Sequence, residues 1–208
     1  MSSSSRPPAG TDATTILEAW LPARFAAARP TWPGDSPVVR LSLSGPGGGD
    51  WELQVEGGRL VVERLLRALG ARRADPDVFI RMAAADFLAV LFPSPDLIEF
   101  LPADAEPAAL LFAQAQDLEL LQKLDGRIKF ELEGRRRRRW SIDVAFGPAG
   151  MRAGRPRTTV RIDSGTCEKL AAGSLAPLPA LLEGRLRVEG DRLLAMQVLM
   201  LVASRLGG

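Results

Sequence analysis

The chain has 208 residues, a formal net charge of +2, 46% hydrophobic residues and 25% charged residues. These are ordinary values for a globular protein, and the length is enough for one large domain or two small ones. The sequence has no histidine, no tyrosine and a single cysteine, Cys167. This composition excludes imidazole-based catalysis, an internal disulfide and a cysteine-rich zinc site. The small charge also argues against a strong polyanion binder.

Residues 1–12 are predicted to be a disordered N-terminus, because they are rich in serine and proline and lack the apolar stretch of a secretory signal. A single thiol fits a reducing compartment, so we expect a cytoplasmic protein. Thr15 and Glu18 have the spacing of a capping box. They predict a helix over residues 19–29, with Pro30 as its stop.

Two hairpin patterns follow, and the second copies the first. Residues 39–45 and 51–55 alternate apolar and polar side chains, as do residues 128–134 and 140–144. Gly45 and Trp51 recur as Gly134 and Trp140 at one common offset, so we predict an internal duplication. Alternation of this kind predicts half-buried antiparallel strands.

A strand and helix over residues 77–91 recur at 159–173 with a smaller offset, which leaves extra residues near 64–70 in the first copy. Residues 102–109, rich in proline, occupy the place of the last strand of the second copy. A helix over 107–123 is predicted to join the copies. We therefore predict an α+β fold of two units, a diverged half at 13–123 and a second half at 124–208, each a mainly antiparallel sheet with helices packed on one face.

The second half ends in a short alternating strand from Gly184 and an apolar helix over residues 193–203. Gly190 and Asp191 separate the two elements, and Gln197 is the one polar residue of the helix. A helix that is apolar all round must be covered on every side or must face an apolar ligand or partner. The apolar stretch is too short to span a bilayer.

Residues 124–206 resemble the sterol carrier protein type 2 family. The resemblance lies in the second hairpin, the strand and helix that follow it, the glycine-centred turn at Gly173, and the Gly184 to Gly190-Asp191 element with its downstream helix. It implies a five-stranded, mainly antiparallel sheet with helices over one face and an apolar tunnel for lipids or fatty-acyl groups. The family has no shared catalytic residues, so none is carried over, and no metal or other cofactor is implied.

Through this resemblance, eight apolar side chains become candidates for the wall of the cavity. Unbranched, polarizable methionine suits such a wall, although each position also fits an ordinary core residue. The candidates are Phe130, Trp140, Leu175, Leu178, Leu193, Met196, Leu199 and Met200.

Three polar features have both a structural and a functional interpretation. Five consecutive arginines, Arg135, Arg136, Arg137, Arg138 and Arg139, form either a solvated hairpin tip or a transient contact with an anionic membrane. Nucleic acid is not predicted as a partner, since no aromatic stacking platform accompanies them. Cys167 near a helix start is either reactive or quietly half-buried. Asp163 and Asp191 are predicted to cap helices, with paired catalysis as the alternative.

The sequence therefore predicts a non-catalytic carrier for a hydrophobic ligand (a sterol, a fatty-acyl group or an isoprenoid-like molecule), as a monomer or homodimer. The first alternative is an enzyme or accessory protein that acts on a hydrophobic biosynthetic intermediate with carboxylate acid–base groups. The second is an assembly module whose apolar face binds another protein.

Overall fold

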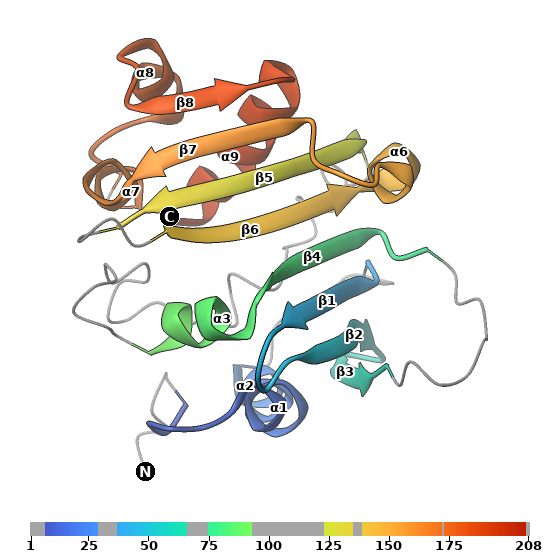
Figure 1. Ribbon diagram of the computed structural model, residues 1–208. Coiled ribbons are helices and arrows are strands. Elements are labelled where there is room, and N and C mark those ends of the chain that lie inside the picture. Colours follow the sequence, from blue (N-terminus) through green and yellow to red (C-terminus); the bar gives the residue numbers. More distant parts are fainter. Residues whose placement is uncertain are drawn as a thin grey trace.

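The computed structural model describes residues 7–28, 37–65, 75–92, 123–134, 139–171 and 173–206. Its centre is one mixed sheet of eight strands in the order β3-β2-β1-β4-β6-β5-β7-β8 (Figure 1). The α+β class predicted from the sequence is confirmed. The two halves share this sheet, however, and do not form a separate sheet each.

The first half contributes four strands and a helical segment. β1 and β2 form an antiparallel hairpin, β3 extends it at the outer edge, and β4 lies parallel to β1. The helical segment begins with α1 and continues through one turn of π-helix, η1, into α2; a further helix, α3, follows β4. The bounds are α1 Ala13–Thr15, η1 Ile16–Trp20, α2 Leu21–Ala28, β1 Val39–Ser44, β2 Gly49–Glu56, β3 Arg59–Arg64, β4 Val78–Ala83 and α3 Ala84–Leu91.

The second half repeats the arrangement of the hairpin and the parallel strand. β5 and β6 form an antiparallel hairpin, β7 lies parallel to β5, and β8 pairs antiparallel with β7 at the outer edge. The bounds are β5 Gly126–Glu133, β6 Arg139–Phe146, α6 Gly147–Arg152, β7 Thr158–Asp163, α7 Ser164–Ala171, α8 Pro177–Leu182, β8 Leu186–Glu189 and α9 Arg192–Leu206.

The hairpins of the two halves are alike in kind but differ in register. Leu41 faces Trp51 across the first hairpin, whereas Leu132 faces Trp140 across the second. When the two copies are aligned by sequence, Leu41 instead matches Phe130, which lies two residues before Leu132. A shift by two residues keeps every side chain on its own face of the sheet, so the same face stays buried. The duplication of two units stays a prediction.

The seam between the halves is the antiparallel pair β4 and β6. Its register places Ile80 beside Val144, which in turn lies beside Ile128 of β5. Leu41 of β1 lies on the other side of Ile80, so these apolar residues form one row on one face. The helical segment and α3 of the first half, and α7, α8 and α9 of the second, pack against that face, and the opposite face carries mostly polar side chains.

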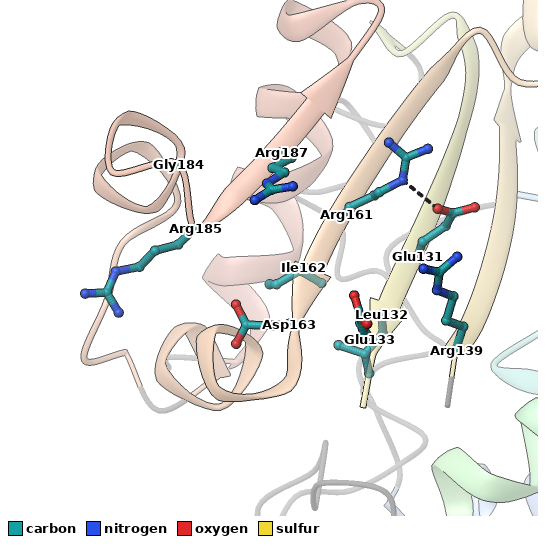
Figure 2. Close-up of a pocket in the computed structure, with 10 residues that line it drawn as sticks. All are labelled: Glu131, Leu132, Glu133, Arg139, Arg161, Ile162, Asp163, Gly184, Arg185 and Arg187. Carbon is teal, nitrogen blue, oxygen red and sulfur yellow. Dashed lines mark hydrogen bonds and ion pairs between the residues drawn. The ribbon is translucent and has the colours of Figure 1, made fainter. Parts of the chain in front are cut away.

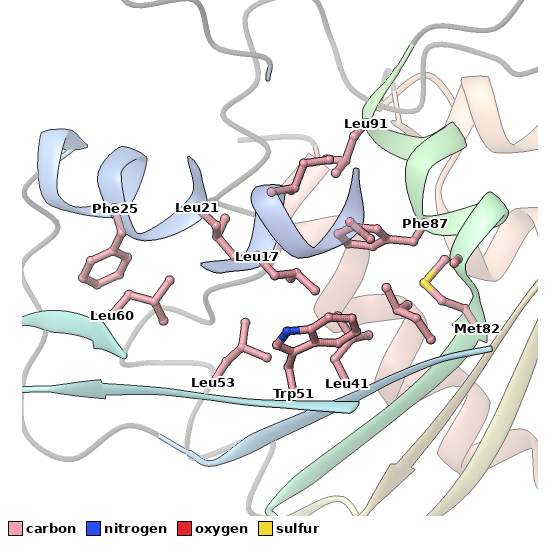
Figure 3. Packing of buried hydrophobic residues seen from close by; sticks show 14 of the residues in the cluster. Leu17, Leu21, Phe25, Leu41, Trp51, Leu53, Leu60, Met82, Phe87 and Leu91 are labelled. Carbon is pink, nitrogen blue, oxygen red and sulfur yellow. The ribbon is translucent and has the colours of Figure 1, made fainter. Parts of the chain in front are cut away.

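Two large hydrophobic clusters and a small third one cover this face. In the first half, Leu17, Leu21 and Phe25 of the helical segment pack on Trp51 and its neighbours in the sheet (Figure 3). The Trp51 indole is fully buried, and its Nε1 donates to Glu18 Oε1 at 2.9 Å. In the second half, α8 and α9 supply the cover, and the site described below lies there.

The predicted start of the first helix was wrong. Asp12 is the N-cap, because its Oδ1 accepts from the backbone N of Thr15 at 2.9 Å and its Oδ2 from Thr15 Oγ1 at 2.9 Å. Thr15 therefore lies inside the helical segment and does not cap it. The strand β3 and the helix α6 were not predicted. The helix predicted over residues 107–123 lies outside the described residues, apart from Lys123 at its end. Residues 102–109, where the first copy is predicted to lack the last strand of the second copy, also lie outside them.

Candidate functional site

The helix α9 carries apolar side chains on both its inner and its outer face. Asp191 caps it, with Oδ1 accepting from the backbone N of Leu194 at 3.0 Å. Leu194, Val198 and Leu199 are buried against the sheet. Leu193 and Met200, seven residues apart and so on one side of the helix, are 69% and 61% exposed. The predicted apolar helix is thus confirmed, and two of its large apolar side chains are exposed.

The predicted cavity residues fall into three places. Leu199 belongs to the buried cluster under α9, and Phe130, Leu175 and Met196 border that cluster as partly buried side chains. Trp140 lies in a separate small cluster with Leu132 and Cys167. The remaining three lie on the outer surface of α8 and α9: Leu178, Leu193 and Met200.

The structure therefore brings together four of the predicted residues around one core, which is bordered by further partly buried apolar side chains. Those on the sheet side are Val144, Ile162 and Val188. Leu181 of α8 and Leu201 of α9 complete the border on the helix side. Apolar groups that are only partly covered at the rim of a core are the kind of lining that small hydrophobic ligands contact.

Sequence reasoning missed Leu182, which is 78% exposed at the end of α8. It lies one helical turn after Leu178, so the two leucines share an outward face. The sequence did contain a signal for this outward face. Two leucines four residues apart follow Pro177, which stands at the first position of the helix.

The polar face of the second half contains a groove of about 220 Å³ (Figure 2). It lies over the ends of the central strands and contains several charged side chains. Its lining is Glu131, Leu132, Glu133, Arg139, Arg161, Ile162, Asp163, Gly184, Arg185 and Arg187. Because it lies across the sheet from α9, it does not form part of the apolar region.

Glu131 is the centre of an ion-pair network in this groove. It accepts from Lys129 Nζ at 2.6 Å and from Arg161 Nε at 2.8 Å, and Arg161 also pairs with Glu189. The hydrogen bonds from Lys129 and then Arg161 hold the pKa of Glu131 below its ordinary value of 4.5. The network ties β5, β7 and β8 together on the polar face.

This network should make stability depend on acid pH. Since the folded pKa of Glu131 is lowered, its contribution is fully present above the ordinary value of 4.5 and is lost as the pH falls through the folded value. We expect the urea unfolding midpoint to fall over that range, and to fall less in Glu131→Gln. Glu133→Gln is the control, because Glu133 is exposed and has no ion pair among the described residues. An equal fall in wild type and Glu131→Gln would contradict the assignment.

The thiol of Cys167 is buried and protonated. It packs with Leu132 and Trp140 beneath α7. Burial raises its pKa from 9.0 to about 12, and the negative charges of Asp163 and Glu168 add to the rise. Of the two interpretations of this residue, the structure supports the quiet thiol.

Alkylation of Cys167 should consequently be slow. At a pH of about 8, a pKa near 12 leaves about a thousandfold less thiolate than an ordinary thiol has. The rate of reaction with iodoacetamide should be lower by at least that factor in the folded protein than in urea. Mass spectrometry of the alkylated protein gives both rates, and folded and unfolded rates within tenfold of each other would contradict the burial.

The two carboxylates proposed as a catalytic pair are both helix caps, as predicted. Asp163 accepts from the backbone N of Thr166 at 2.9 Å and from its Oγ1 at 2.7 Å. Burial raises the pKa of Asp163, but these hydrogen bonds outweigh it and the pKa is lowered. The backbone N of Asp191 donates to Thr158 Oγ1 at 3.1 Å, at the opposite end of β7. The ends of β7 are five residue steps, about 16 Å, apart, so the two carboxylates do not converge.

Other candidate sites find little support within the described residues. No group of three or more carboxylate or cysteine side chains there is placed to hold a metal ion. No helix in that part of the chain is long and apolar enough to cross a bilayer. Of the five arginines at the hairpin tip, Arg139 begins β6 and lines the groove, whereas residues 135–138 lie outside the described residues.

Comparison with known proteins gives a family match that includes the apolar region. Residues 108–203 match the sequence model of the SCP-2 sterol transfer family. The chain is also similar to two proteins named hydroxysteroid dehydrogenase-like protein 2. It is 28% identical to the Xenopus tropicalis protein over 102 residues, which cover 46% of this chain and 24% of that protein. It is 30% identical to the Xenopus laevis protein over 84 residues, which cover 38% of this chain and 20% of that protein.

Solved structures give a partial likeness. The apo sterol carrier protein 2 of Yarrowia lipolytica aligns with 45% of this chain and 79% of its own, at a TM-score of 0.34 and 16% identity. The sterol carrier protein domain 2 of Helicoverpa armigera also aligns with 45% of this chain and 79% of its own, at a TM-score of 0.34 and 22% identity. The chain spans about a quarter or less of the length of the curated relatives. The sequence model of the SCP-2 sterol transfer family thus matches residues 108–203, slightly less than half of the chain.

Proposed function

We propose that the second half of the chain binds a hydrophobic small molecule (a sterol, a fatty-acyl group or an isoprenoid-like molecule) and carries it without changing it chemically. The observation that carries this proposal is α9, which is apolar on the face that packs on the sheet and on the face that does not. The family match of residues 108–203 supports it.

The proposed binding region lies where α9 meets the sheet. Phe130 on β5 and Met196 on α9 border the same core from opposite sides, and both are partly buried. An apolar ligand between them would gain about 25 cal/mol for each Å² of apolar surface removed from water. Methionine is unbranched and polarizable, so Met196 would adapt to ligands of different shape.

The direct test is titration of delipidated protein with fluorescent fatty-acyl and sterol probes. Saturable binding of either probe supports the proposal, and the better probe identifies the ligand class. If neither probe saturates, and native mass spectrometry of protein from its own host finds no bound lipid, the proposal fails.

Met196→Gln should weaken probe binding about tenfold, because an amide placed at an apolar contact loses hydrogen bonds to water when the ligand covers it. Probe fluorescence gives the affinity, and thermal unfolding checks that the variant is folded. Val61→Gln is a matched control, since Val61 is an apolar residue on β3, at the far edge of the sheet. Equal affinity of Met196→Gln and wild type would place the ligand elsewhere.

An enzyme is the weaker alternative. Its proposed acid–base pair, Asp163 and Asp191, is split between the two ends of β7 and engaged in helix capping. The relatives carry a dehydrogenase-like name, but the similarity reaches about a quarter or less of their length. For location we propose the cytoplasm, from the single thiol alone, and cell fractionation of the host tests it.

A further inference from the structure

We infer that both halves of the chain build the region proposed to bind the ligand, with β4 of the first half as one of its walls and Ile80 as a residue that contacts the ligand. This inference rests on the proposed function and deepens it. It gives the first half a part in that site, although the family model matches residues 108–203 and so leaves β4 out.

The two halves have an arrangement of three strands in common. In each half, a hairpin is followed by a strand that lies parallel to the first strand of the hairpin. The resulting orders are β2-β1-β4 and β6-β5-β7. Among the described residues, the first half then adds β3 beside β2, and the second half adds β8 beside β7 (Figure 1). Each half therefore has one strand that the other half does not supply for itself.

The seam between the halves fills both of these positions. β4 lies antiparallel to β6, at the side of the second hairpin where β3 lies antiparallel to β2 in the first. β6 in turn lies antiparallel to β4, as β8 lies antiparallel to β7. The sheet thus contains two overlapping sets of five strands, β3-β2-β1-β4-β6 and β4-β6-β5-β7-β8.

The residues paired across these strands agree with this arrangement. Four residues after the tryptophan of each hairpin, Val55 lies opposite Leu60 of β3, and Val144 lies opposite Ile80 of β4. All four side chains belong to, or pack against, a hydrophobic cluster on the face that the helices cover. Ile80 therefore has the place in the second half that Leu60 has in the first.

The hydrophobic cores of the two halves are joined at β4. Val78 of this strand is 6% exposed and belongs to the cluster of the second half, together with Ile128 of β5 and Val198 of α9. Ile80 is partly buried and packs against the clusters of both halves. The core beneath α9 therefore includes side chains of the first half.

Ile80 also lies at the rim of this core, where the ligand is proposed to bind. Besides the residues of the second half named above, it borders the same cluster as Phe130 and Met196. Val39 of β1, which pairs with Val78, borders the cluster too. An apolar ligand at this rim would remove apolar surface of both halves from water, and each such contact stabilises the complex.

Photolabelling of the full chain tests this contact directly. Delipidated protein is saturated with a fatty acid or a sterol that carries a diazirine, irradiated and digested with trypsin, and the labelled peptides are identified by mass spectrometry. We expect label in peptide 193–205, which contains Met196, and in peptide 74–81, which contains Ile80. Peptide 60–64 of β3 is the internal control. It should stay unlabelled, because Leu60 and Val62 pack in the cluster of the first half.

A substitution measures how much the contact contributes to binding. Ile80→Ala should weaken binding of the fluorescent probe about fivefold, since it removes apolar surface from the lining. Val62→Ala is the matched control, because Val62 is also a partly buried β-branched residue of the sheet but packs against the cluster of the first half. Its probe affinity should equal that of wild type. Thermal unfolding shows whether each variant is folded.

The inference and the proposed function fail in different ways. The inference is overturned if a probe binds saturably without labelling peptide 74–81, if Ile80→Ala binds as tightly as wild type, or if Val62→Ala loses as much affinity. If Ile80→Ala does not fold, the labelling of wild type decides alone. If no probe binds saturably, the proposed function itself fails, and the inference fails with it.

Discussion

Replacing Arg127 with methionine should lower the free energy of unfolding by about 3 kcal/mol, because it leaves a carboxylate without its partner in a mostly buried place. Arg127 Nε donates to Asp143 Oδ1 at 2.8 Å and its Nη2 to Oδ2 at 2.6 Å. The side chains are 7% and 15% exposed, respectively. Urea unfolding followed by circular dichroism measures the loss.

The same guanidinium contacts two further parts of the structure. Its Nη1 donates to the backbone O of Ala153, just after α6, at 2.6 Å. Its Cζ lies 5.9 Å from the centre of the Phe79 ring on β4, across the seam between the halves. The hydrogen bond to Asp143 raises the pKa of Arg127 above its ordinary value. Removing one side chain therefore loosens β5, β6 and the segment after α6 together.

Two comparisons show whether the cost comes from the unpaired charge. Arg127→Met/Asp143→Leu should recover most of the lost stability, since it removes both charges and leaves apolar groups of similar size. Arg185→Met breaks the exposed pair with Glu183 and should change stability by less than about 1 kcal/mol. Equal losses in Arg127→Met and Arg185→Met would mean that burial does not set the value of the pair.

Local patterns predicted most of the individual elements of this fold. The alternation of apolar and polar residues predicted the hairpins around Trp51 and Trp140. Gly190 and Asp191 predicted the start of the last helix. The strand β3 was missed although Gly57 and Gly58, both at positive φ, form the two-residue turn that precedes it. That turn was a readable signal.

The shared sheet was beyond local reasoning. The β4 and β6 pair joins residues such as Ile80 and Val144, which are distant in the chain, and the order of strands depends on which edges remain open after each half has formed. An internal repeat predicts two similar units but says nothing of the edge at which they meet.

The faces of α9 show a second limit. Leu193 and Leu194 are neighbours of the same type, yet the first is exposed and the second buried. Hydrophobic periodicity assigns faces by contrast with polar residues, and a helix with a single polar residue in that stretch offers no contrast. The predicted cavity residues on this helix were therefore divided between its two sides.

Gly190→Ala should destabilise the second half by about 3 kcal/mol or more, since it combines backbone strain with a steric clash. Gly190 has a φ of +93°, which L-residues with side chains rarely adopt, and a Cβ there would lie 2.1 Å from the backbone O of Arg157. The glycine lets the turn between β8 and α9 press against the start of β7, where Asp191 N reaches Thr158 Oγ1. A bulkier residue must push this turn away and disturb the cap of α9.

Gly184→Ala separates the two causes, because Gly184 has a similar φ of +71° but open space where a Cβ would stand. It should cost about 1 kcal/mol, the strain alone. Urea unfolding of both variants gives the difference, and probe binding shows whether the apolar region depends on the seating of α9. If the two alanine variants were equally stable, close packing of the turn on β7 would not be the reason for a glycine at position 190.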